Sequence, residues 1–568
     1  MVQLSALPYH EPDIVIILIL TSFLLLLNII GHVLDKLIYC GLLGQLFIGV
    51  AWGSPGGQWL SVGTQEVFVQ LGYLGLILLV YEGGLATNFQ ALKSNLFLSM
   101  FVALTGISAP LGISFILVGL VDATPLQAFT AGAALCSTSL GTTFTVLKTS
   151  GLTQSRLGVV LPSSAMLDDV VGLVMVQVIA NLRITESTFS ASTVVRPIGV
   201  SIAFAIVVPV VCRFVVKPLV TKLRRSDAKP NRFLIIKSQV AFSIHTAILI
   251  GFVVGSSYAG TSNLFAAYLA GACISWYDSE IVNLPRPSIS KDLTTTGGSK
   301  SAQVKAGDSG HQRNTRVHLD ADIDEIVPST TSPPEPRMPP SPAASENGGP
   351  LESEAQTHLN DKEGAHAKPT EASSAALETQ SEPSEPTTGM STWAIYCETP
   401  LSVILKPLFF ASIGFSIPIS QMFTGSIVWR GFVYSMLMVL AKLLCGAWLI
   451  RLSSNAAPAS GLDAQKKGRG LPRPKSLYPA SILGWAMVAR GEIGFFISAI
   501  AESHGIFSSA GGDGSSELFL IVTWALMLCT IAGPIAVGLL TRRVRMLQKI
   551  ERDTLGGRED PLGIWGIK

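Results

Sequence analysis

The chain carries little charge for its length and has almost no excess of either sign. Only 14% of its 568 residues are Asp, Glu, Lys or Arg, against about 25% in soluble domains. The net charge of +2 excludes the strongly basic footprint of a nucleic-acid-binding protein. The seven cysteines lack the spacing of metal ligands or of a disulfide framework, and the apolar segments hold no Ser/His/Asp or Cys/His constellation. We therefore expect neither an enzyme nor a cofactor.

Hydrophobic residues are abundant instead, at 48% of the chain, and the mean hydropathy is +0.48. They gather in segments of about the 20 residues that a helix needs to cross a bilayer. These segments lie at residues 12–34, 37–53, 66–86, 95–121, 126–148, 157–181, 194–218, 234–258, 262–278, 396–420, 427–451, 477–504 and 516–541. The sequence predicts an all-α polytopic membrane protein with about thirteen transmembrane helices, the first of them retained rather than cleaved as a signal peptide.

Basic residues accumulate in alternate loops between these segments. The largest groups lie at residues 217–232 and 466–475 and in the tail at 542–545. The intervening loops carry few Lys or Arg, and basic loops of membrane proteins face the cytoplasm. We expect an external N-terminus and a cytoplasmic C-terminus. No address signal distinguishes the plasma membrane from an endomembrane.

Residues 285–395 differ in composition from the rest of the chain. Pro, Ser, Glu, Thr and Gly dominate and long apolar runs are missing, so this stretch has too little apolar surface to offset the entropy of ordering. We predict a disordered cytoplasmic loop that separates helices one to nine, in residues 1–284, from helices ten to thirteen, in residues 396–541. Residues 542–568 would be a short cytoplasmic tail. The sequence leaves open whether the loop is a linker or a regulatory segment.

The predicted membrane helices contain a small set of charged residues: Asp168, Asp169, Lys442, Arg490 and Glu492. A charge at the bilayer centre costs about 2.5–3.5 kcal/mol on insertion scales, so each needs a partner or a water-filled cavity. We expect Lys442 to pair with Asp168, which leaves Asp169 free to exchange a proton for a cation. Arg490 and Glu492 are close enough in sequence to pair with each other. The alternative, a soluble helix with an internal ion pair, is disfavoured by the surrounding apolar segments.

Two of the predicted helices contain polar residues or glycines that could interrupt them. The fifth includes Ser137, Thr138 and Ser139, and the twelfth has Gly491 and Gly494 beside its charges. The hydroxyls of the fifth could simply bond back to an unbroken helix. Alternatively, both helices are interrupted near mid-membrane, where free carbonyls and hydroxyls would ligate a hard cation. Helices one to six and eight to thirteen would then form an inverted repeat around the seventh.

At these positions the chain resembles the sodium/proton exchanger superfamily, and within it the cation:proton antiporter-2 branch. The resemblance is carried by Ser137-Thr138-Ser139, Ala165-Met166-Leu167-Asp168-Asp169, Pro407-Leu408-Phe409-Phe410-Ala411-Ser412-Ile413-Gly414, Lys442 and Arg490-Gly491-Glu492. It covers nearly all of the chain outside 285–395 and the tail. The long insertion at 285–395 suggests a fungal-type member.

The resemblance implies a sodium/proton antiporter fold in which the fifth and twelfth helices are broken and cross. It also implies a homodimer, in which a core of helices four to six and eleven to thirteen moves against a dimerisation domain. Asp169 would be the principal ion-binding residue, and Asp168 its lysine-paired neighbour, with Lys442 as that lysine. Thr138 and Ser139 fall where the family's broken helix contributes ligands, so Asp169, Asp168 and Thr138 would hold the monovalent cation.

The expected function is a secondary antiporter that exchanges Na⁺ or K⁺ for H⁺ across a lipid bilayer by an elevator-like alternating-access cycle. Two alternatives stay open. One is an inverted-repeat carrier or symporter for an organic anion, held by Arg490 and Lys442. The other is a K⁺ efflux pathway without obligatory proton counterflow.

Overall fold

The computed structural model describes residues 11–139, 141, 155–182, 191–218, 222, 238–282, 388–450, 476–508, 516–553, 562 and 565. Every regular element in these ranges is a helix, as predicted. Most of the predicted disordered loop, 285–395, lies outside the described residues. Its last part does not fit that prediction, because a helix begins at Gly389 behind a capping box of Thr388 and Ser391, which satisfies the first free N–H groups.

The helical elements before residue 283 are α1 (Ile14–Ile38), α2 (Gly41–Trp52), α3 (Val62–Leu85), α4 (Phe89–Ser94), α5 (Leu96–Ser114), α6 (Leu117–Leu120), α7 (Pro125–Ala134), α9 (Arg156–Asn181), α10 (Ala191–Val211), η1 (Cys212–Val216), α12 (Ser238–Ala259), α13 (Asn263–Tyr277) and η2 (Asp278–Val282). Those after residue 387 are α14 (Gly389–Tyr396), α15 (Glu398–Pro400), η3 (Leu401–Leu405), α16 (Lys406–Gly414), α17 (Ile419–Met422), α18 (Gly425–Leu443), η4 (Leu444–Gly446), α20 (Tyr478–Val488), α21 (Glu492–Ser503) and α22 (Glu517–Asp553). Each of the thirteen predicted segments therefore contains helix.

Length and hydropathy qualify nine helical stretches of the described residues to cross a membrane, or ten when the bent pair Gly389–Tyr396 and Glu398–Gly414 counts as one. The chain is thus a multi-pass membrane protein. The count of thirteen crossings stays a prediction, because α2 and α7 as described are shorter than a bilayer requires and α13 is not among the qualifying stretches. At the C-terminal end, α22 continues to Asp553, so the first part of the predicted tail is an extension of the last helix.

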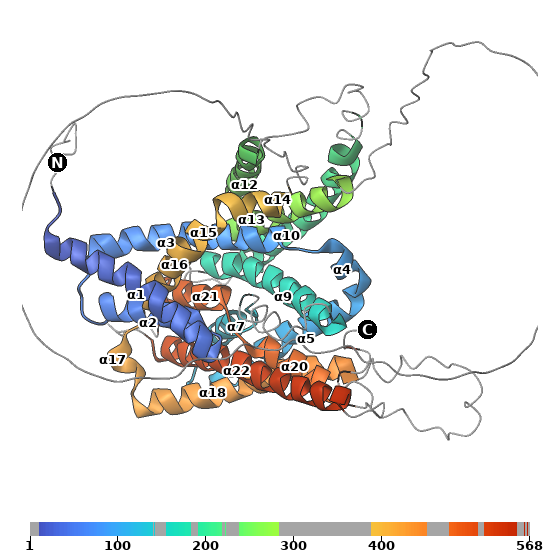
Figure 1. The fold of residues 1–568 in the computed structure, drawn as a ribbon. Helices are drawn as coiled ribbons and strands as arrows, with labels where there is room; N and C mark the ends of the chain where they lie inside the picture. Colours follow the sequence, from blue (N-terminus) through green and yellow to red (C-terminus); the bar gives the residue numbers. More distant parts are fainter. Residues whose placement is uncertain are drawn as a thin grey trace, which may run out of the picture. The chain divides into compact units, whose positions relative to one another are not determined.

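The helices pack in two groups within the described residues. One group, here called the scaffold bundle, contains α1, α2, α3, α12, α13, α14 and α16. The other, called the core bundle, contains α5, α7, α9, α18, α20, α21 and α22. In Figure 1 the long axes of α3, α9 and α22 lie roughly along one direction, although the chain runs along α9 in the opposite sense to α3. Helix α10 contacts both groups, through α9 in the core bundle and α13 in the scaffold bundle.

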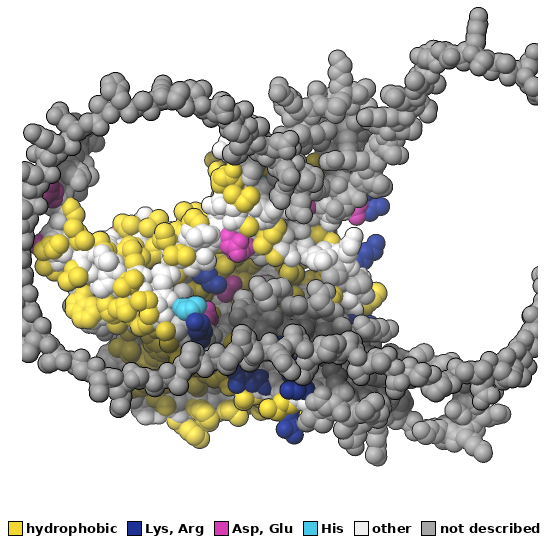
Figure 2. Space-filling view, viewed as in Figure 1, with side chains coloured by type: hydrophobic (Ala, Val, Ile, Leu, Met, Phe, Trp, Pro, Cys, Tyr) yellow, Lys and Arg dark blue, Asp and Glu magenta, His cyan; other side chains and the backbone are white. Residues whose placement is uncertain are grey.

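The outer faces of the helices are apolar, as contact with lipid requires. Helix α1 exposes large side chains such as Ile14 and Leu18, and α10 exposes Ile202, Ile206 and Val207, all by more than half. Figure 2 shows a largely hydrophobic surface over the face that includes α1 and α3, with few charged side chains. The charged residues predicted to function in transport are instead buried among the helices, as Asp168, Asp169, Lys442 and Arg490 are.

Helices α3 and α13 make the closest crossing of the scaffold bundle. A Cβ at Gly84 would lie 2.2 Å from the carbonyl oxygen of Tyr268, and a Cβ at Gly271 would lie 2.3 Å from that of Tyr81. Both distances are far below van der Waals contact, so only glycine allows the two backbones to approach this closely. Small residues are the usual means of close packing between membrane helices.

We predict that Gly271→Ala destabilises the protein by about 1–3 kcal/mol or more, since the added methyl must push α13 away from α3. The matched control is Gly255→Ala on α12, where a Cβ would meet nothing within 4 Å. Thermal unfolding in detergent should show a lower midpoint for Gly271→Ala and an unchanged or higher one for Gly255→Ala. Equal midpoints would contradict the packing described here.

Candidate functional site

Two predicted helices are interrupted inside the core bundle. Helix α7 begins with a capping box of Thr124 and Gln127 and ends at Ala134, and residues 135–139 are not helical. Helix α20 ends at Val488, and Gly491 is extended at φ −127° and ψ −162° before α21 begins. The predicted break of the twelfth helix is thereby observed. For the fifth, the first half and the break are described, whereas residues 140 and 142–154 lie outside the described residues.

The two breaks cross and run in opposite directions. Ser139 donates its N–H to the carbonyl of Ala489 at 2.9 Å, and the guanidinium of Arg490 donates to the carbonyl of Ser137 at 3.3 Å. Further along, a Cβ at Gly494 would lie 2.5 Å from the carbonyl oxygen of Ala134. As residue numbers fall in one segment they rise in the other. The segments therefore pass antiparallel, which is the relation expected between the halves of an inverted repeat.

Lys442 and Asp168 form an ion pair at this crossing, as the sequence predicts. The ammonium nitrogen of Lys442 lies 2.6 Å from Oδ2 of Asp168, and both side chains are fully buried. The same ammonium donates to the hydroxyl of Thr138 at 2.9 Å and to the carbonyl of Cys136. Thr138 in turn donates to Asp168 at 2.6 Å. Lys442 thus neutralises a carboxylate and satisfies a carbonyl that the end of α7 leaves free.

Asp169 has a different neighbour and no basic partner within 4.0 Å among the described residues. Its Oδ1 accepts a hydrogen bond from the hydroxyl of Ser137 at 3.1 Å, and 8% of the residue remains exposed. The resemblance assigns the ligand role to Thr138 and Ser139, whereas the structure places the Thr138 hydroxyl on the Asp168 side. Ser137, which the sequence does not single out as a ligand, is the hydroxyl beside Asp169.

Gly172, one turn after Asp168 on α9, explains how the unwound segment reaches these carboxylates. A Cβ at this position would lie 3.1 Å from Cβ of Ser137 and 3.2 Å from a methyl of Ile493. Any larger residue would push Ser137 away from α9. The glycine therefore allows the hydroxyl to approach Asp169.

The predicted local pair of Arg490 and Glu492 is wrong. Among the described residues no ion pair joins them, because the extended Gly491 turns the chain between them. Arg490 is fully buried and donates to the carbonyl of Ser137, while Glu492 opens the first turn of α21. Glu492 lies close enough to Asp169 for their carboxylates to repel each other. The site therefore combines two basic groups that donate to free carbonyls with a second acid, Glu492, whose charge opposes that of Asp169.

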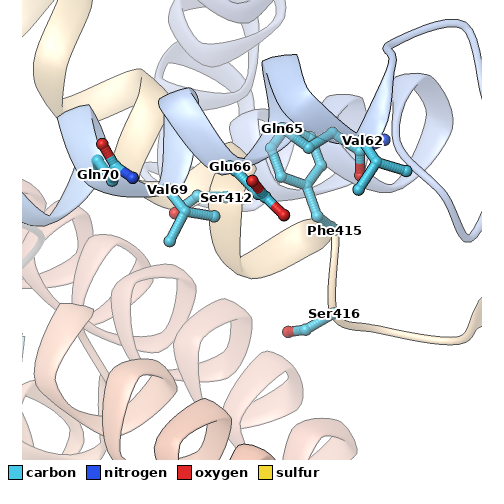
Figure 3. A pocket seen from close by; sticks show the side chains of 8 residues that line it. All are labelled: Val62, Gln65, Glu66, Val69, Gln70, Ser412, Phe415 and Ser416. Atoms are coloured by element: carbon cyan, nitrogen blue, oxygen red, sulfur yellow. The ribbon is translucent and has the colours of Figure 1, made fainter. Parts of the chain in front are cut away.

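A cavity of about 390 Å³ lies elsewhere, between α3 and the end of α16. Figure 3 shows Gln65, Glu66 and Gln70 of α3 on one side and Phe415 and Ser416, just after α16, on the other. None of its lining residues belongs to the cluster around Asp169. The cavity is therefore separate from the candidate ion site.

The fold and the crossing define a class of helical membrane protein with two interrupted helices around buried carboxylates. Residues 17–286 and 391–543 match the model of the family described as sodium/hydrogen exchanger, transmembrane. The chain belongs to this family. The match leaves out residues 287–390, most of the insertion recognised from composition.

Individual relatives are similar over parts of the chain. A probable Na⁺/H⁺ antiporter of Bacillus cereus, GerT, is 26% identical over 259 residues, which cover 45% of this chain and 64% of the relative. The high-affinity Na⁺/H⁺ antiporter NhaS3 of Synechocystis is 32% identical over 140 residues, which cover 24% of this chain and 30% of the relative. The matched parts thus span less than two thirds of these curated relatives. In fold, the chain is similar to the sodium proton antiporter MjNhaP1 of Methanocaldococcus jannaschii, with a TM-score of 0.53 at 12% identity, over 93% of this chain and 98% of that one.

We predict that Lys442→Met lowers the stability of the protein by about 3–5 kcal/mol, because it leaves Asp168 buried without a counter-charge. The double variant Lys442→Met/Asp168→Asn should recover much of this loss. The matched control is Lys217→Met, which removes one partner of an ion pair exposed by 41% and 48%, a change worth about 0–1 kcal/mol. Thermal unfolding of the four proteins in detergent measures the comparison. A Lys442→Met variant as stable as Lys217→Met would show that the buried pair does not hold the crossing.

Proposed function

We propose that the protein is a secondary antiporter, not an enzyme, that exchanges Na⁺ or K⁺ for H⁺ at Asp169. The observation that carries the proposal is the unequal treatment of two adjacent buried carboxylates. Asp168 is compensated by Lys442 at 2.6 Å, whereas within the part of the chain that the structure describes Asp169 receives only the hydroxyl of Ser137. Membership of the exchanger family and the names of the relatives, which include a Na⁺/H⁺-K⁺ antiporter of Bacillus cereus, support it.

The charges around the crossing explain why one ion at a time would be held. When all groups are ionised, Asp168, Asp169 and Glu492 outnumber Lys442 and Arg490 by one negative charge. A monovalent cation or a proton at Asp169 makes the cluster neutral. Oxygen atoms are the ligands that Na⁺ and K⁺ share with other hard cations, and carboxylate and hydroxyl oxygens are the groups present here. Cation and proton would therefore compete for one site.

Neutralisation would also control movement. An unpaired charge in the bilayer centre costs about 2.5–3.5 kcal/mol or more, so the core bundle would move readily only when Asp169 carries a cation or a proton. The division of the helices into core and scaffold bundles suits an elevator-like cycle in which the core carries the site across. We further propose a homodimer with a cytoplasmic C-terminus, based on the family resemblance and on the basic loops.

The organic-anion carrier is less well supported by the site. Such a carrier needs free basic groups, but Lys442 is bound to Asp168, Thr138 and the carbonyl of Cys136. Arg490 donates to the carbonyl of Ser137 through one nitrogen, while its Nε and Nη2 have no hydrogen-bond partner within the described residues; an anion at these nitrogens would add to the negative charge of Asp168, Asp169 and Glu492. A K⁺ efflux pathway would use the same oxygen-rich site without proton counterflow, and the transport assay distinguishes it.

The principal test uses purified protein in liposomes with an internal pH dye and an imposed proton gradient. Wild type should move protons on addition of Na⁺ or K⁺, and Asp169→Asn should not, because an amide cannot exchange a proton for a cation. Glu66→Gln is the matched control, since Glu66 is an acid of the separate cavity, and it should behave as wild type. Cation flux without proton movement would favour the efflux pathway. No response to Na⁺, Li⁺ or K⁺ from folded wild type would refute the antiporter.

Glu492→Gln should raise the cation concentration needed for half-maximal exchange. The change removes a negative charge that acts on Asp169, and a loss of about 1 kcal/mol of attraction for the cation corresponds to roughly a fivefold weaker apparent affinity. Titration of Na⁺ or K⁺ in the liposome assay measures the shift. An unchanged half-maximal concentration would mean that Glu492 takes no part in holding the cation.

A further inference from the structure

Two cysteine thiols from distant parts of the chain lie next to each other outside the ion site. Cys212 opens the π-helical turn η1 at the end of α10, and Cys273 lies on α13. Their sulfur atoms are 3.7 Å apart although 61 residues separate them in sequence. Both are free and only partly buried. No comparable sulfur–sulfur contact joins any other two cysteines, all of which fall in the described residues.

The thiols are close enough to become bonded with little movement. A disulfide requires the sulfurs at about 2.05 Å, with the Cα atoms within about 4.4–6.8 Å. At 3.7 Å the two sulfurs are already in van der Waals contact, so oxidation has to close a gap of about 1.7 Å. The π-helical turn at Cys212 is a local departure from regular helix of the kind often found at functional positions.

The surroundings favour reaction at this pair. Lys217, which follows η1, forms an ion pair with Glu280 of η2 at 2.8 Å, so the same two segments meet again beyond the thiols. Lys217 lowers the pKa of the Glu280 carboxyl by a hydrogen bond and by its charge, which keeps the pair ionised near neutral pH. The partly exposed ion pair also marks the polar end of these helices, where a soluble oxidant has access.

The pair lies beside one of the contacts between the two bundles, which also meet directly where α9 touches α13 and α16 touches α21. Helix α10 packs on α9, which carries Asp168 and Asp169, and also touches α13, which packs extensively on α3 of the scaffold bundle. A covalent bond from η1 to α13 would fasten the helix next to α9 onto the scaffold. Any movement of the core bundle that shifts α10 relative to α13 would then be hindered.

We propose that Cys212 and Cys273 are a reversible redox site, whose oxidation to an intramolecular disulfide slows transport. With a low-molecular-weight disulfide such as glutathione disulfide, one thiolate displaces a glutathione thiolate and forms a mixed disulfide, and the second thiolate then displaces the other glutathione. The net reaction converts two protein thiols and one glutathione disulfide into one protein disulfide and two glutathione thiols, so both electrons pass to glutathione. The effect on transport rests on the exchange function proposed above, whereas the bond itself does not.

The first experiment counts thiols in the full-length purified protein. The reduced protein is treated with glutathione disulfide, denatured and labelled with a maleimide polymer that shifts its gel mobility. Wild type should fall from seven reactive thiols to five, while Cys212→Ser and Cys273→Ser should keep all six that they have. Cys397→Ser is the matched control, because Cys397 is also partly buried but has no neighbouring thiol, and it should fall from six to four. Peptide mass mapping of oxidised wild type should show residues 212 and 273 linked.

Each result decides the proposal. No loss of thiols, a glutathione adduct on a single cysteine, or a bond mapped to other residues would overturn the redox site. The mapping uses wild type, so it does not depend on the folding of a variant.

In liposomes, oxidised wild type should exchange at least roughly fivefold more slowly, the low end of common coupling between sites, and dithiothreitol should restore the rate. Cys212→Ser should keep its rate under oxidation. A mapped bond with an unchanged rate would overturn the regulatory role, and wild type that exchanges no cation at all would refute the transport function while the thiol count still stands.

Discussion

The core bundle depends on giving partners to the main-chain groups that two interrupted helices leave free inside the membrane. Unsatisfied carbonyls and amides are costly there because no water replaces the lost helical bonds. Lys442 binds the carbonyl of Cys136, Arg490 binds that of Ser137, and Ser139 pairs with Ala489 across the crossing. The two buried basic residues therefore serve the backbone first. Only with these bonds in place can the breaks stay open next to the carboxylates of α9.

The same arrangement makes two neighbouring aspartates chemically different. Consecutive residues of a helix point about 100° apart. Asp168 therefore faces Lys442 on α18 and the hydroxyl of Thr138, while Asp169 faces the hydroxyl of Ser137. One carboxylate is used to neutralise the lysine and the other keeps an open side. One turn of α9 therefore carries both the carboxylate that pairs with Lys442 and the carboxylate that can bind a cation or a proton.

Much of the fold follows from the sequence because its main signals are local. Apolar length predicted helix in every one of the thirteen segments, and two adjacent acids with a distant lysine predicted the pair of Asp168 and Lys442. The hydroxyl beside the ion-binding carboxylate could not be predicted in the same way. An unwound segment has no helical period, so the sequence does not indicate which of three consecutive hydroxyls faces which carboxylate. The structure places Ser137 rather than Thr138 beside Asp169. The predicted ion pair of Arg490 and Glu492 is wrong because the extended backbone at Gly491 points their side chains in different directions.

By itself the sequence determined the class of protein, the places where charge enters the membrane, and the positions where helices could break, because hydropathy, charge and glycine act within a few residues of chain. The tertiary structure decided which groups meet. Gly172 admits Ser137 to Asp169, Gly271 brings α13 onto α3, and η1 brings Cys212 to Cys273 across 61 residues. These contacts depend on how closely whole helices approach, and that distance is set by packing between segments far apart in the sequence.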